Sequence, residues 1–132
     1  MIKFLSYVWQ LPQNIVGLLY LVILKWRNTL VGTITAKGLK DDETSIYFKE
    51  SRGCVSLGCY VFLSQTSVAS TTLKHELGHH VQSKMLGPLY LIVIGLPSIL
   101  WAGLRRLGLF KSFSYYAFYT ERWADNIAKI KR

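Results

Sequence analysis

The stretch Lys74-His75-Glu76-Leu77-Gly78-His79 organises the whole chain, because two histidines stand four residues apart in it. Positions i and i+4 of a helix share a face, so His75 and His79 can direct two imidazole nitrogens at one ion about 2 Å away. Glu76 then lies beside that ion, within reach of a water molecule. The pattern predicts a helix over 70–86 that ends before Gly87-Pro88.

A second polar pattern, Glu121-x-x-x-Asp125, lies in a helical stretch expected over 112–130. Glu121 is the candidate third ligand of the ion. Asp125 would accept a hydrogen bond from the other ring nitrogen of a ligand histidine and so fix its tautomer. Two histidines, one carboxylate and an open fourth position are typical of catalytic Zn²⁺, which is therefore the predicted cofactor.

An HExxH stretch followed by ExxxD resembles the gluzincin branch of zinc metallopeptidases. This resemblance implies a zincin-like minimal domain that hydrolyses peptide bonds, with Glu76 as the catalytic base and a peptide or protein as the substrate. More loosely, most of the chain resembles small bacterial membrane-associated proteins that combine an LPQN segment, an SLG strand, the HExGH helix, a GPLY-GLPS segment and a YTE-x-x-AD ending. Here these are residues 11–14, 56–58, 75–79, 87–98 and 119–125.

Peptide hydrolysis at such an ion needs two further contributions from side chains. Glu76 would take a proton from water and pass it to the leaving amine, and a hydrogen-bond donor would stabilise the oxyanion. The sequence does not choose among the candidate donors, which are Tyr119, Tyr116 and Arg122, followed by Tyr115, Tyr60 and His80. Two other functions stay open: a non-catalytic membrane-bound regulatory protein with structural zinc, and a basic membrane-active protein in which the motif is incidental.

The composition indicates one domain that meets a membrane surface. The chain has 132 residues, is 51% hydrophobic and has a net charge of +9, from 16 Lys and Arg against 7 Asp and Glu. The basic residues stand singly or in pairs beside apolar segments and form no stripe or arm, which argues against nucleic-acid binding. Membrane lipid is the expected partner, at the cytoplasmic side of a bacterial inner membrane.

Two apolar segments, 1–27 and 87–106, limit how the chain can meet that membrane. The first could span it, lie in its interface or form a buried core helix, and it lacks the cleavage site of a removable signal peptide. The second separates His79 from Glu121, although both must reach one ion. It is therefore expected to bend back at Gly95-Leu96-Pro97, to lie in the interface, or to form the core of the domain.

The expected fold class is α+β and mostly helical, with a small antiparallel β-hairpin or sheet beside the helix at 70–86. Strand signals occupy residues 44–64: one run at 44–48, a turn at 51–53, and a run at 55–63 with a glycine bulge or break. Residues 32–43 are expected to form a solvated connection. The kinked segment at 87–106 and the third-ligand helix at 112–130 complete the single domain.

Overall fold

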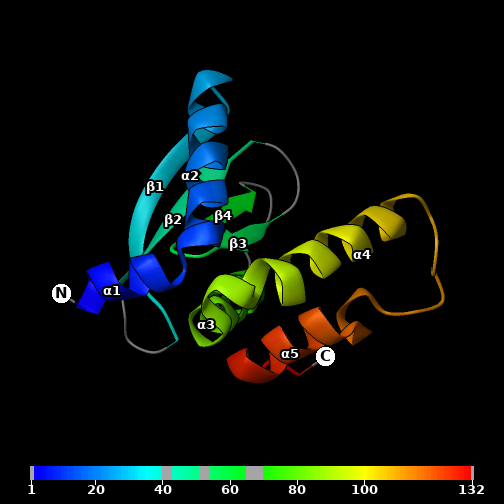
Figure 1. Cartoon of the computed structure of the whole chain (residues 1–132). Coiled ribbons are helices and arrows are strands. Elements are labelled where there is room, and N and C mark those ends of the chain that lie inside the picture. Colours follow the sequence, from blue (N-terminus) through cyan, green and yellow to red (C-terminus); the bar gives the residue numbers. More distant parts are fainter. Residues whose placement is uncertain (1, 40–42, 51–53, 65–69, 132) are drawn as a thin grey trace.

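The computed structural model describes residues 2–39, 43–50, 54–64 and 70–131, and it has a mixed α+β fold in which helices dominate (Figure 1). The fold class predicted from the sequence is confirmed at this level. Short 3₁₀ and π-helical turns are labelled η. In chain order the elements are α1 (Ile2–Trp9), α2 (Leu11–Trp26), β1 (Leu30–Lys37), β2 (Glu43–Lys49), β3 (Val55–Leu57), β4 (Tyr60–Ser64), α3 (Ser70–Leu86), η1 (Gly87–Leu89), η2 (Leu91–Gly95), α4 (Leu96–Arg106), η3 (Tyr115–Ala117) and α5 (Tyr119–Ala128).

The four strands form one mixed sheet in the order β1-β2-β4-β3. Strand β2 pairs with β4 in parallel, whereas β1–β2 and β3–β4 are antiparallel. The prediction of a simple hairpin between 44–48 and 55–63 is therefore wrong. Gly58 has a φ of 64°, which starts a tight turn and splits the second run into the hairpin β3–β4. The turn predicted at 51–53 lies outside the described residues.

Strand β1 occupies part of the segment that was expected to be a solvated connection. Its sequence, LVGTITAK, mixes β-branched residues with polar ones, and the side chains of Val31 and Ile34 are about half exposed. An edge strand needs a partner on one side only, so it tolerates this composition. The prediction for 32–43 is therefore wrong as far as Lys37, and also at Glu43, where β2 begins.

The sheet positions the motif helix because α2 packs on one face and the start of α3 contacts the other face at the β3–β4 side of the sheet. Leu21 and Leu24 of α2 pack with Phe62 on one face. Val61 and Leu63, which alternate with Phe62 along β4, pack toward Leu73 of α3 on the other. Figure 1 shows α2 lying across the sheet, with α3 beyond its β3 edge.

Buried amides at the start of α2 tie this helix to the end of α3. The side-chain amide of Gln13 donates to Ser83 Oγ and to the Gly87 carbonyl, both at 2.8 Å, and Ser83 donates to Gln10 Oε1 at 2.6 Å. Asn14 Oδ1 accepts from the Cys59 amide at 2.7 Å, which holds the β3–β4 turn. The polar residues Gln10, Gln13 and Asn14, which interrupt the first apolar segment, thus make contacts between elements.

The second apolar segment bends earlier than predicted. The chain bends by 120° at Tyr90, between the helices Thr71–Leu89 and Leu91–Arg106. Three residues earlier, Gly87 has a φ of 55°. Pro97 lies in the first turn of α4, where its missing N–H is tolerated after the π-helical turn η2. Of the three alternatives for this segment, the bend at Gly95-Leu96-Pro97 is therefore wrong, because the chain turns at Tyr90 instead.

The last helix is shorter than predicted. It runs from Tyr119 to Ala128 rather than over 112–130, because Phe118 has an extended backbone with ψ of 143° and separates α5 from the 3₁₀ turn η3. This break places the tyrosines of η3 and the carboxylates of α5 on separate elements.

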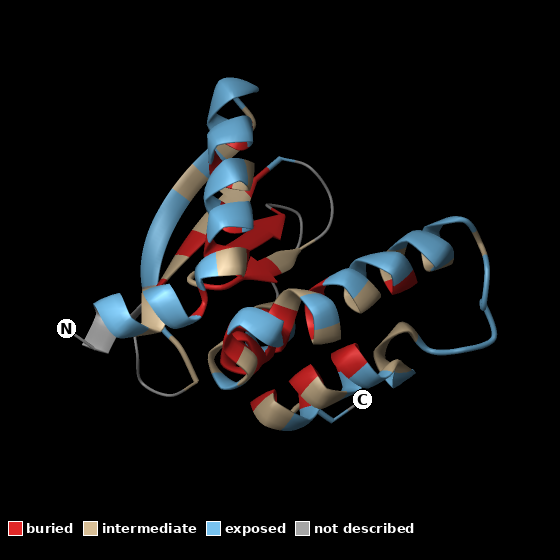
Figure 2. Ribbon diagram, in the orientation of Figure 1, coloured by how far each residue is buried: buried red, intermediate tan, exposed pale blue. Residues whose placement is uncertain are grey.

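The outer faces of α2 and α4 are apolar and exposed (Figure 2). In the part of the chain that the structure describes, no single helix has the length and apolarity of a membrane span. By length and composition alone, the bent pair Thr71–Leu89 and Leu91–Arg106 passes that test when its members are taken together. The exposed apolar side chains on the two faces include Ile15, Leu18, Leu19, Val22, Ile23, Leu96, Ile99, Leu100 and Leu104.

Candidate metal centre

Three side chains from α3 and α5 converge at one buried point. Glu121 Oε1 lies 3.2 Å from His75 Nε2 and 3.1 Å from His79 Nε2. All three residues are at most 5% exposed, and their possible ligand atoms lie within 4.8 Å of one another. The sequence places the histidines on one face of α3, and the packing of α5 on α3 brings in Glu121.

The second ring nitrogens of both histidines are held by acceptors. His75 Nδ1 donates to Asp125 Oδ1 at 2.7 Å, which is the contact expected from the sequence. His79 Nδ1 donates to Gln82 Oε1 at 2.6 Å, and the Gln82 amide donates to the Thr120 carbonyl at 3.1 Å. These bonds direct both Nε2 atoms at the centre. Sequence reasoning missed Gln82, although its place three residues after His79 puts it on the same helix face.

The other oxygen of Glu121 is also fixed. Ser98 donates to Oε2 at 2.7 Å and Thr120 donates to it at 2.5 Å. Only Oε1 is thereby left to face the histidines. Ser98 was not singled out from the sequence, because its approach depends on the path of α4 and not on any local pattern.

The converging atoms of the two histidines and Glu121 need a proton or a metal ion between them. With each Nδ1 acting as a donor, a neutral ring offers only a lone pair at Nε2, and Glu121 Oε1 is itself an acceptor. Burial acts to raise the pKa of Glu121, but hydrogen bonds with His75 and His79 outweigh it and hold that pKa far below its usual range. Burial acts to lower the pKa of His79, yet Glu121 and Glu76 raise it to about 9. A ring proton or a metal ion satisfies this arrangement, so the group could hold a metal ion.

Glu76 is placed beside the three ligands and is not one of them. A cleft lies beside the ligands, and His75, His79, Glu121 and Glu76 all line it. Glu76 is 5% exposed, and its Oε2 has no hydrogen-bond partner among the described residues. Burial raises the pKa of the Glu76 carboxyl, and the charges of His79 and His75 offset part of this rise. A buried carboxylate with an unpaired oxygen next to a cation site suits a proton acceptor.

The cleft brings in two of the candidate oxyanion donors, Tyr115 and Tyr116. The ring of Tyr116 meets His75 edge to face at 5.3 Å. Burial, followed by the charges of Glu121 and Glu76 and by a hydrogen bond with Glu121, raises the pKa of the Tyr115 hydroxyl.

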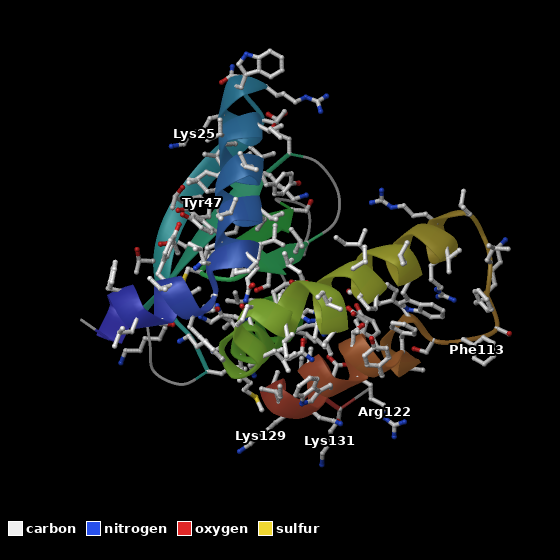
Figure 3. The ribbon with its side chains drawn as sticks, in the orientation of Figure 1. Lys25, Tyr47, Phe113, Arg122, Lys129 and Lys131 are labelled. Atoms are coloured by element: carbon white, nitrogen blue, oxygen red, sulfur yellow. The ribbon has the colours of Figure 1, made fainter. Side chains whose placement is uncertain are left out.

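The other candidate donors point elsewhere. Tyr119 donates to the Val93 carbonyl at 2.7 Å, and Tyr60 pairs with Tyr7 at 3.2 Å. His80 contacts the Gly58 carbonyl at 2.7 Å. Arg122 lies on the side of α5 that faces away from α3 (Figure 3). None of these four residues lines the cleft that is lined by His75, His79 and Glu121.

Comparisons of the chain with protein-family models, with curated proteins and with solved structures returned no match. The interpretation of this centre therefore depends on its own geometry.

Proposed function

We propose that the chain is a zinc-dependent metallopeptidase of the gluzincin type. The observation that carries this proposal is the buried convergence of two imidazole nitrogens and one carboxylate oxygen on a cleft that also contains Glu76. Two histidines and a glutamate are a ligand set of catalytic zinc. Ligand atoms of a tetrahedral zinc site lie about 3.3 Å apart, and the two nitrogen–oxygen distances here are 3.2 and 3.1 Å.

The side chains divide the work of peptide hydrolysis among them. Zinc, when bound, supplies a Lewis acid that polarises the scissile carbonyl and acidifies water. Glu76 accepts a proton from water and delivers it to the leaving amine, a role that its raised pKa favours. Tyr115 or Tyr116 donates a hydrogen bond to the oxyanion. Asp125 and Gln82 hold the two histidines in the tautomer that presents Nε2.

Metal analysis and peptide hydrolysis test this proposal together. Protein purified in detergent without chelator should carry about one zinc per chain and cleave a mixed peptide library. A chelator should abolish cleavage, and added zinc should restore it. Stoichiometric zinc without cleavage of any peptide would instead support a structural site, and zinc near zero would leave the motif without a metal.

We predict that zinc affinity rises with pH between about 6.5 and 9. In the metal-free chain the His79 pKa of about 9 means that a proton occupies the site at neutral pH. Zinc must displace that proton, so affinity should increase about tenfold per pH unit and level off above the pKa. Competition with a chromogenic chelator at pH 7 and pH 8 measures this slope. Equal affinities at the two pH values, corrected for the chelator's own protonation, would contradict it.

We also propose that the enzyme works on an anionic membrane surface. This is supported by the apolar outer faces of α2 and α4, which are exposed in the same view, and by the basic residues at the ends of these helices (Figure 2). Apolar side chains favour the acyl boundary of a bilayer, and each nearby Lys or Arg adds about 1 kcal/mol with anionic lipid. The basic residues are Lys25, Arg27, Arg105 and Arg106.

Substitutions on these two faces should weaken membrane binding. Leu19 and Leu100 are 58% and 59% exposed, so their replacement with Glu should leave the fold intact. We expect Leu19→Glu and Leu100→Glu each to reduce binding to vesicles containing phosphatidylglycerol at least tenfold, through lost apolar burial of about 1.5 kcal/mol and added charge repulsion. Asn126→Glu, which makes the same charge change at an exposed position of α5, is the control for vesicle sedimentation. Wild-type protein that stays in the aqueous phase would refute the membrane proposal.

A further inference from the structure

A second cavity continues the cleft beyond the metal centre. The cleft has a volume of about 240 Å³ and the second cavity about 340 Å³. Both are walled by Val55 of β3, by Ser98 and Ile99 of α4, and by Tyr115. Because the two spaces share these walls, they are adjacent, and together they are called the groove between β3 and α4.

The far end of this groove carries positive charge. Lys49 and Arg106 line the second cavity, and no acidic residue of the described chain does so. Lys49 is only 2% exposed, which is unusual for a lysine. Arg106 is exposed and has no hydrogen bond to a described residue. Its neighbour Arg105 instead donates to the carbonyls of Phe110 and Phe113.

The two ends of the groove therefore carry different charged side chains. Glu76 and Glu121 stand at the metal end, and Lys49 and Arg106 stand at the other. When the ligands hold a metal ion, its charge offsets those of Glu76 and Glu121, so a negative group of the substrate is attracted chiefly to the end that carries Lys49 and Arg106. The guanidinium of an arginine matches a carboxylate with two parallel N–H donors, which adds geometric selectivity.

We propose that Lys49 and Arg106 form a subsite for a carboxylate of the substrate, to one side of the bond that is cleaved. This inference deepens the proposed peptidase function and rests on it. The carboxylate belongs to an Asp or Glu side chain or to the free C-terminus of a peptide, and both sources have the chemistry that this pair of cations recognises.

Binding measurements on a non-hydrolysing variant test the subsite. Full-length Glu76→Gln in neutral detergent, loaded with zinc, is titrated against fluorescent peptides, and anisotropy gives Kd. The peptides are related pairs: Glu against Gln at each position of an otherwise neutral peptide, and free against amidated C-terminus. Arg106→Gln and Lys49→Met are then introduced, with Lys131→Gln as the control for loss of one exposed charge.

We expect at least one carboxylate peptide to bind roughly tenfold more tightly than its neutral partner. Arg106→Gln and Lys49→Met should each remove most of that difference, while Lys131→Gln should leave it unchanged. Because Lys49 is buried, Arg106→Gln alone decides the question if Lys49→Met does not fold. Equal affinities within every pair would overturn the subsite.

The failure of this inference can be told apart from the failure of the proposed function. Peptides that bind without regard to charge leave the peptidase intact and remove the subsite, whereas an absence of all peptide binding removes both. If Arg106→Gln weakens binding to anionic vesicles and leaves the peptide difference unchanged, the cations serve a lipid head group and the substrate subsite is refuted.

Discussion

Glu76→Gln should reduce kcat for peptide cleavage by about a thousandfold or more while the protein keeps its zinc. A general base contributes on the order of 10²- to 10⁴-fold to such reactions, and an amide cannot take up the proton. Glu76 is not among the residues whose ligand atoms converge, so its loss leaves the metal ligands in place. Burial of the charged carboxylate opposes folding, as the raised pKa of Glu76 indicates, and a neutral amide removes that cost. The variant should therefore unfold at the same temperature as wild type or at a higher one.

The measurement combines turnover, metal content and thermal unfolding on the same preparation. Glu50→Gln makes the same acid-to-amide change at an exposed position after β2 and should match wild type in all three. Wild-type turnover by Glu76→Gln would refute the proposed mechanism. Loss of zinc from Glu76→Gln would show instead that the carboxylate is a ligand.

The part of the site that follows a helical period was predictable from the sequence. The bounds 70–86 of the motif helix are those of α3, because its periodicity and the Gly87-Pro88 stop are local signals. The spacing of Glu121 and Asp125 likewise placed both on one face of α5, and the contact between Asp125 and His75 follows from it. These inferences required only the geometry of a single helix and one pairing between two helices.

The features that failed depend on how distant elements pack. Strand β1 was missed because an exposed edge strand has the composition of a loop. The parallel pairing of β2 with β4 was missed because no local pattern distinguishes a bulge at Gly58 from a turn. Ser98 reaches Glu121 only because the chain bends at Tyr90 and not at Pro97. Tyr119 is close to Glu121 in the sequence, but it does not reach the metal centre, because its hydroxyl donates to the Val93 carbonyl.

Gly78→Ala should separate the two halves of the metal centre. A Cβ at Gly78 would overlap the carbonyl oxygen of Ala124 in α5, a backbone atom that cannot rotate away. Helix α5 would have to move off α3, and Glu121 would move with it away from both histidines. We expect destabilisation of about 1–3 kcal/mol from overpacking and at least a tenfold loss of zinc affinity.

The sign of this effect distinguishes packing from helix propensity. Alanine normally stabilises a helix interior over glycine by roughly 0.5–1 kcal/mol, so intrinsic propensity alone predicts that Gly78→Ala raises the unfolding temperature. Gly103→Ala is the matched control, because a Cβ there meets no atom within 4 Å and α4 should gain that propensity. Thermal unfolding and zinc competition on both variants decide between the two. If Gly78→Ala stabilises the protein and binds zinc as wild type does, then α3 and α5 are not in the close contact that brings Glu121 to the histidines, and the proposed metal centre loses its third ligand.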